Sequence, residues 1–174
     1  NPPGQFQSPD TVLIAGYGRV GQNVARALRD AHVPCIVIDV DPDVTYNARC
    51  DRVPSIYGDA SNIHVLSTLD IARMKALVVT YPDALSVTAT VEAAFKLNPR
   101  LRVMARVHRQ EDVDRIRRLG EVELVNPEYE ASVELVRRVL SAEGWMGNDI
   151  TDLIGRIRAN PAVCEIGSQD DNGS

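Results

Sequence analysis

Residues 11–21 read TVLIAGYGRVG, and this stretch decides the fold of the chain. An apolar, β-branched run leads into glycines at the Gly-x-Gly-x-x-Gly spacing, which connects a strand to a helix around a bound phosphate. Asp39 ends the next apolar run, 18 residues after Gly21. The order of strand, glycine turn, helix and downstream acid predicts a site for an adenine nucleotide.

Each residue of this motif has its own expected role. Gly16 allows the tight turn out of the strand, Gly18 lets the backbone approach a phosphate, and Gly21 lets the helix pack close to the sheet. The helix N-terminus offers free N–H groups and partial positive charge, with the Arg19 guanidinium beside them. Asp39 would accept both ribose hydroxyls and repel a 2′-phosphate, which favours AMP, ADP, ATP or NAD(H) over NADP. The alternative is a Rossmann-type turn that binds nothing.

Short apolar runs alternate with amphipathic stretches along the chain. The expected strands are 12–15, 35–39, 53–56, 76–80, 102–106 and 122–125. The expected helices are 20–31, 44–50, 63–69, 84–97, 111–119 and 127–143. Apolar strands joined by helical crossovers predict an α/β protein with a Rossmann-like, doubly wound, parallel six-stranded sheet.

Other polar residues lie where these strands and helices meet. Asp41 and Asn126 are expected N-caps, each followed by a proline suited to a first helical turn. Asp59 follows the third strand and either faces the adenine amino group or caps the next helix. Thr80 ends the fourth strand and Arg106 the fifth, at the sheet edge where such folds bind ligands. Arg106 either reaches phosphate or pairs with a surface carboxylate.

Composition and the two ends of the chain set further limits. The formal net charge of −5 argues against a nucleic-acid binder. The sequence contains no run of 18 apolar residues, so it does not predict a membrane span. Residues 1–10 are expected to be a linker, because the chain starts with Asn1 in a Pro-rich segment and looks like a domain cut from a longer protein. The nucleotide-binding domain is expected over 11–145. A short helical or disordered tail is expected over 146–174, with a helix near 150–157 and disorder over 167–174.

The sequence does not predict an enzyme. His32, His64 and His108 are scattered, and none has an evident carboxylate or metal partner. No substrate domain follows the Rossmann-type unit, so a complete hydride-transfer site is not expected. The alternative is a fragment of an NAD-dependent oxidoreductase.

The last predicted helix, 127–143, carries more apolar surface than one buried face needs. Its apolar residues cover an arc of roughly 200°, against about 100° for an ordinary surface helix. The apolar positions are Tyr129, Ala131, Val133, Leu135, Val136, Val139, Leu140 and Ala142. This pattern favours burial against both its own sheet and a second chain. The alternative is burial by Trp145 and the 150–157 segment.

Four segments together resemble a known family, the RCK/KTN (TrkA-N) domains, over about residues 11–143. They are the glycine motif at 16–21, IDVD at 38–41, YGDAS at 57–61 and VNPE at 125–128. The segment PEYEAS at 127–132 is most similar to the C-terminal domains of Kef-type cation:proton antiporters. These domains regulate potassium channels and transporters from the cytoplasmic face of the membrane.

The resemblance implies a nucleotide site, an assembly and a role. It implies a domain that binds AMP, ATP or NAD(H) and gates a membrane channel or antiporter domain in the same or a partner chain. It also implies a homodimer through the C-terminal helix, which in some relatives extends to a ring. Glutamates that hold divalent ions in some relatives are replaced here by ARVHR at 105–109, so no metal is expected. The implied site residues are Gly16, Tyr17, Gly18, Arg19, Val20, Gly21, Asp39, Val40, Asp59, Ala60, Thr80 and Arg106.

Overall fold

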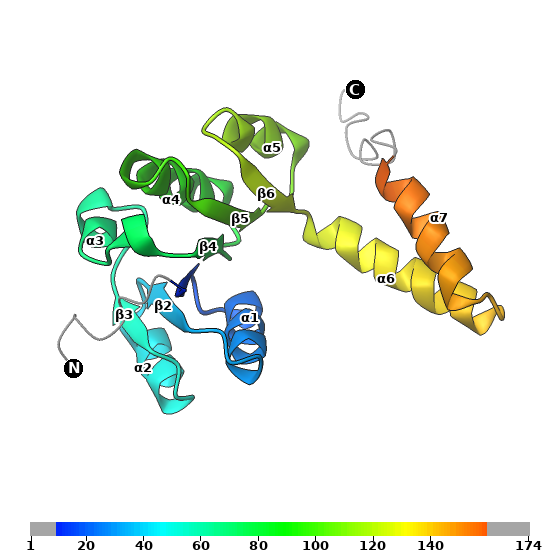
Figure 1. Cartoon of the computed structure of the whole chain (residues 1–174), viewed down its shortest axis with the longest axis horizontal. Coiled ribbons are helices and arrows are strands. Elements are labelled where there is room, and N and C mark those ends of the chain that lie inside the picture. The colour runs from blue at the N-terminus through cyan, green and yellow to red at the C-terminus, as the bar shows by residue number, and fades with distance from the viewer. Residues whose placement is uncertain (1–9, 160–174) are drawn as a thin grey trace, which may run out of the picture. The chain divides into compact units, whose positions relative to one another are not determined.

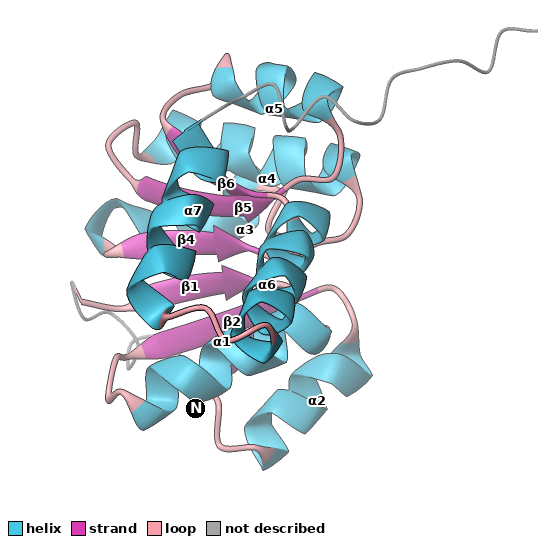
Figure 2. Ribbon diagram, turned by 90° about the vertical axis from the view of Figure 1, so that its right-hand side faces the viewer, coloured by secondary structure: helices cyan, strands magenta, loops and turns pink. Residues whose placement is uncertain are grey.

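A parallel sheet forms the centre of the structure. The computed structural model describes residues 10–159, and within them six strands pair in the order β3-β2-β1-β4-β5-β6, all parallel. The labelled arrowheads in Figure 2 accordingly point the same way. The strands are β1 (Val12–Ala15), β2 (Cys35–Asp39), β3 (Ser55–Tyr57), β4 (Ala76–Val79), β5 (Arg102–Arg106) and β6 (Val122–Val125). This order confirms the doubly wound Rossmann-like fold and places its switch point between β1 and β4.

Helices connect consecutive strands, and two of their starts confirm the predicted caps. The Asp41 carboxylate accepts hydrogen bonds from the amides of Asp43 and Val44, and the Asn126 side chain accepts one from the amide of Tyr129. The helices are α1 (Arg19–Asp30), α2 (Pro42–Cys50), α3 (Ile63–Ser67), α4 (Ala84–Leu97), α5 (Gln110–Arg117), α6 (Pro127–Ala142) and α7 (Gly147–Ala159), with a 3-10 turn at Ile71–Arg73.

The third strand starts later than predicted. The sequence predicts it over 53–56, whereas β3 is Ser55–Tyr57. Val53 is buried, but its amide donates to the carbonyl of Ala48 and so closes the end of α2. A buried valine at a helix end and one at a strand start give the same apolar pattern, which explains the shift.

Two hydrophobic clusters cover the two faces of the sheet. Alternate residues of β1 point to opposite faces, so Leu13 joins one cluster and Ile14 the other. All four residues of β1 are buried, and Leu13, Ile14 and Ala15 are fully buried. The glycine turn that follows β1 is therefore anchored to the most enclosed strand of the sheet.

The chain divides into two compact units between Val125 and Asn126. In the second unit α6 and α7 lie side by side (Figure 1), packed through Val133, Ile150 and Ile154. This corresponds to the second alternative for the apolar arc of α6, burial by the segment that follows it. Segments 1–9 and 160–174, which include the predicted linker and the predicted disorder at 167–174, lie outside the described residues.

The packing of α7 buries only part of the apolar arc of α6. Leu135 and Val139, one helical turn apart on α6, have exposed fractions of 63% and 60%. Among residues 10–159, no helix combines the length and the apolar character needed to cross a membrane.

Candidate functional site

The glycine turn has the close packing that its sequence predicts. Gly16 has a φ of 98°, in the left-handed region that favours glycine, and a Cβ there would lie 2.7 Å from Oγ1 of Thr80. A Cβ on Gly21 would overlap the carbonyl oxygen of Gly16. Gly18 differs, because a Cβ there would have no neighbour within 4 Å in the described chain. Internal packing therefore accounts for Gly16 and Gly21, while Gly18 leaves open space at the start of α1.

The N-terminus of α1 is left without a cap. Gly18 is its N-cap residue and provides no side-chain hydrogen bond, and the first turn holds no acidic residue. The amides of Arg19, Val20 and Gly21 form no hydrogen bond within residues 10–159. By contrast, side chains cap α2, α3, α4 and α6. Free N–H groups and the helix dipole together favour an anionic group at this point.

Asp39 is fixed beside this turn by the backbone. The residue is 9% exposed, and its carboxylate accepts a 2.8 Å hydrogen bond from the amide of Tyr17 and a 3.0 Å hydrogen bond from the amide of Asp41. Each oxygen receives one of these bonds and keeps a second lone pair. An ionised carboxylate in this position can accept further hydrogen bonds from a diol such as a ribose.

Tyr17 contributes to the site through its backbone. Its side chain is buried in the core cluster on the α1 side, and its hydroxyl donates to Oδ2 of Asp51 at 3.2 Å. Burial raises the pKa of this hydroxyl above its ordinary value, and the hydrogen bond to Asp51 raises it further. Tyr17 therefore presents its backbone amide to Asp39, while its ring is buried away from solvent.

The structure excludes one of the two roles expected for Asp59, which follows β3. Asp59 does not cap α3, because Asn62 accepts the hydrogen bond from the amide of His64. Asp59 instead accepts from the amide and the hydroxyl of Ser61 at 2.8 and 2.7 Å. Ala60 is fully buried in the core.

Thr80 braces the turn from the neighbouring strand. Its hydroxyl lies 3.1 Å from the carbonyl oxygen of Ala15 and 3.0 Å from that of Gly16, and its side chain is 6% exposed. These contacts tie the end of β4 to the end of β1 across the switch point. Val20 and Val40 are 40% and 54% exposed and give this edge apolar surface.

Arg106 lies at the end of β5, two strands from β1 in the sheet order. Its guanidinium contacts the His108 ring at 2.9 Å and forms no ion pair with a carboxylate within the described part of the chain. Its buried Nε has no hydrogen-bond partner among residues 10–159. Val79 pairs with Ala105, so Arg106 lies next to Thr80 at the carboxyl edge of the sheet and two strands away from the glycine turn.

The sequence analysis missed Tyr81. A Cβ placed on Gly16 would come within 3.2 Å of the Tyr81 ring, so this ring lies against the glycine turn. Its hydroxyl is buried without a partner in residues 10–159. Burial raises the pKa of Tyr81, and the carboxylates of Asp39, Asp59 and Asp83 add to that effect. The ring thus lies against the glycine turn with its hydroxyl in the neutral form.

Comparison with known proteins identifies the family. The model of the TrkA-N domain matches residues 12–127, about two thirds of the chain. This chain belongs to the TrkA-N domain family. An Alkalimonas amylolytica protein named as a K⁺ efflux antiporter, KefB, is 32% identical over 149 residues, which are 86% of this TrkA-N chain. The chain spans 22% of the length of that relative.

Two solved structures extend the comparison. The Kef C-terminal domain of Shewanella denitrificans in its AMP-bound form has a TM-score of 0.70 and 25% identity, over 90% of this TrkA-N chain and 96% of its own. A structure of GsuK bound to ADP has a TM-score of 0.57 and 26% identity, over 70% of this chain and 31% of its own. AMP and ADP are both adenine nucleotides, the ligand class that the glycine turn and Asp39 predict.

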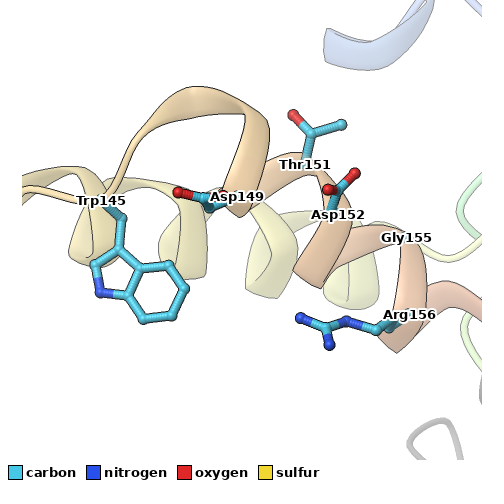
Figure 3. A pocket seen from close by; sticks show the side chains of 6 residues that line it. All are labelled: Trp145, Asp149, Thr151, Asp152, Gly155 and Arg156. Carbon is cyan, nitrogen blue, oxygen red and sulfur yellow. The ribbon is translucent and has the colours of Figure 1, made fainter.

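A hollow of about 660 Å³ lies elsewhere, in the second unit of the TrkA-N chain. Figure 3 shows its lining side chains along α7, with the Trp145 indole at one end and the Arg156 guanidinium at the other. Asp149, Thr151, Asp152 and Gly155 complete the lining. Within the described chain, no three His, Cys, Asp or Glu side chains gather so as to hold a metal.

Proposed function

We propose that this chain is a regulatory domain that binds an adenine nucleotide and gates a potassium channel or a K⁺/H⁺ antiporter. The observation that carries the proposal is the pairing of Asp39, held by two backbone amides, with the uncapped N-terminus of α1. The Asp39 carboxylate suits a ribose diol, and the N-terminus of α1 suits a phosphate. The nucleotide is AMP, ADP, ATP or NAD(H). It acts as an effector and is released without chemical change.

The proposed contacts follow the chain through the site. The amides of Arg19, Val20 and Gly21 would hold the phosphate, with Gly18 admitting it and the Arg19 guanidinium closing over it. Asp39 would accept the ribose hydroxyls, and Val40, Asp59 and Ala60 would face the adenine. The remaining predicted residues act behind or beside the ligand, since Gly16, Tyr17 and Thr80 shape the turn and Arg106 would meet only the far half of a dinucleotide.

The proposed partner is a transmembrane channel or antiporter domain, in the same chain or another, at the cytoplasmic face of the membrane. The KefB relative, named as a K⁺ efflux antiporter, supports this assignment, and so does a Methanocaldococcus jannaschii protein named as a probable potassium channel, which is 33% identical over 122 residues. A nucleotide that binds one dimer geometry more tightly than another shifts the population toward that geometry, and so biases the gate. The shift cannot exceed the difference between the two affinities.

The proposed assembly is a homodimer through α6. The exposed Leu135 and Val139 support it, because they form an apolar strip on the helix beside the face that α7 covers. Larger rings built from such dimers belong to the same proposal.

Isothermal titration calorimetry of the 174-residue chain with AMP, ADP, ATP, NAD⁺ and NADH tests the nucleotide assignment. Saturable binding of at least one of these, weakened by Asp39→Asn, supports it. The matched control is Asp114→Asn, which removes one exposed charge on α5. Binding that is absent in the wild type, or equal in both variants, contradicts the site. A nucleotide recovered chemically changed after incubation would favour an oxidoreductase.

A further inference from the structure

A second cavity lies in the first unit, between α1 and the end of α2. Its volume is about 430 Å³, within the range of small-molecule sites. From α1 it is lined by Gln22, Arg26 and Arg29, which share one helix face because they are four and three residues apart. Opposite them lie Asp51 and Arg52, just after α2.

The arginines of this cavity lie away from the candidate nucleotide site, although Tyr17, whose amide is bonded to Asp39, also lines the cavity. Helix α2 starts beside Asp39, at the carboxyl edge of the sheet, and runs for nine residues to Cys50. At 1.5 Å per residue, its end lies about 13 Å from that edge. Arg26, Arg29 and Arg52 therefore line a different part of the unit from the uncapped start of α1.

The charges around the cavity are unbalanced. Three arginines and one carboxylate line the cavity, and Arg29 also pairs with the Asp30 carboxylate at 3.8 Å, in a chain whose formal net charge is −5. Arg29 donates to the backbone carbonyl of Asp51 at 2.6 Å, and the Asp51 carboxylate accepts from the Tyr17 hydroxyl. The guanidinium groups of Arg26 and Arg52 form no hydrogen bond or ion pair within residues 10–159. Two unpaired guanidinium groups at one concave surface attract anions against the overall charge of the protein.

We propose that this cavity binds a compact anion carrying two or more negative charges, held by Arg26, Arg29 and Arg52. Guanidinium groups match the oxygen pairs of phosphates and carboxylates, with which they form charge-assisted, bidentate hydrogen bonds. The Tyr17 hydroxyl and the Gln22 amide at the cavity add neutral polar groups. The ligand class is thus a small phosphate ester, a pyrophosphate or a polycarboxylate. The site does not depend on the proposed function of the glycine turn.

Calorimetry of the 174-residue chain at low ionic strength tests this site, with pyrophosphate and citrate as separate probes. We expect saturable binding of at least one probe, and the stronger probe decides between phosphate and carboxylate chemistry. The double variant Arg26→Gln, Arg52→Gln should weaken that binding by at least about tenfold, because it deletes charge-assisted hydrogen bonds. Amide chemical-shift changes at residues 50–53 should accompany binding in the wild type.

The controls separate this site from general charge and from the nucleotide site. The variant Arg117→Gln, Arg118→Gln makes the same charge change at the exposed end of α5 and should alter affinity less than about twofold. Asp39→Asn should still bind the probe saturably, because it keeps the three arginine side chains that hold the anion. The proposal fails if neither probe binds saturably, if the Arg26/Arg52 variant binds as the wild type does, or if the α5 variant loses as much affinity.

Discussion

Gly21 lies directly against the carbonyl group of Gly16, so α1 packs onto the turn after β1 with no space for a side chain. The carbonyl of Gly16 is itself in contact with the Thr80 hydroxyl at 3.0 Å. Three segments, the end of β1, the first turn of α1 and the end of β4, therefore meet within a few atoms. The position of the α1 N-terminus depends on this contact.

Gly21→Ala should destabilise the fold, because its methyl group would overlap backbone atoms that cannot move independently of β1. We expect a loss of about 1–3 kcal/mol, the usual range for overpacking. Gly18→Ala is the matched control, since its φ of −70° suits any residue and no protein atom lies near its Cβ. It should stay within about 1 kcal/mol of wild type in urea unfolding, yet weaken nucleotide binding. Equal stability losses in both variants would contradict this account.

Asp39→Asn should lower stability as well as nucleotide affinity. A carboxylate accepts from the amides of Tyr17 and Asp41 at once, whereas an amide side chain has one acceptor oxygen and presents an NH₂ group to the other donor. Leaving a buried N–H without a partner costs about 1–3 kcal/mol, which urea unfolding would measure. Asp114→Asn on α5 should leave stability within about 0.5 kcal/mol of wild type. A variant of Asp39 as stable as wild type would show that the two amides are not restrained by the carboxylate.

Tyr81→Phe should retain or increase stability. The hydroxyl that it removes is buried without a partner in the described chain, and the ring that packs against the turn is kept. Removing an unsatisfied buried polar group avoids a desolvation cost of about 1–3 kcal/mol. Tyr17→Phe is the contrasting variant, because the Tyr17 hydroxyl is bonded to Asp51. A clear loss of stability in Tyr81→Phe would mean that its hydroxyl has a partner after all.

Asp83 should give the domain an acid-dependent component of stability. Its carboxylate caps α4 by accepting a 2.8 Å hydrogen bond from the amide of Ser86, which lowers its pKa below the ordinary value of 3.8. A folded-state pKa below the unfolded value stabilises the fold above the unfolded pKa, and this contribution is lost as pH falls through the folded pKa. Asp83→Asn, which retains a capping oxygen, should therefore lose less stability than wild type in that acidic window. Urea midpoints at pH 7 and in acid would decide, and parallel losses in both proteins would contradict the prediction.

Leu135→Asp combined with Val139→Asp should prevent dimerisation through α6. The two side chains lie outside the contact of α6 with α7, so the second unit should still fold. Sedimentation equilibrium would measure the change, with Ser141→Asp as a control on the polar part of the helix. A wild type that is monomeric at all concentrations, or a double variant that still dimerises, would contradict the proposed assembly.

Much of the fold could be predicted from the sequence because its signals are local and repeated. Four strands, including β1 and β2, have the predicted bounds, and α4 does too. The caps at Asp41 and Asn126 could be predicted because a short polar side chain before proline has few other uses. β3 could not be placed exactly, since the burial of Val53 serves α2.

The site was less predictable because tertiary contacts decide which group a residue presents. The sequence indicates that Tyr17 belongs to the turn, but not that its ring is buried and only its amide meets Asp39. The sequence places Thr80 at the binding edge, but it does not show that the Thr80 hydroxyl contacts two backbone carbonyls of the glycine turn. Tyr81 was missed because the Tyr-Pro pair after β4 gives only a turn signal. Its position directly after Thr80, at the switch point, was the available clue.

The uncapped N-terminus of α1 limits how far this domain can be engineered for thermostability. Gly18 has extended backbone angles that serine adopts freely, and serine is among the best N-cap residues. A designer who scores folding alone would therefore replace Gly18, and the new hydroxyl would occupy the amides meant for a phosphate. Such a protein would be more stable but would bind the proposed nucleotide more weakly, so thermostability and regulation would compete at a single position.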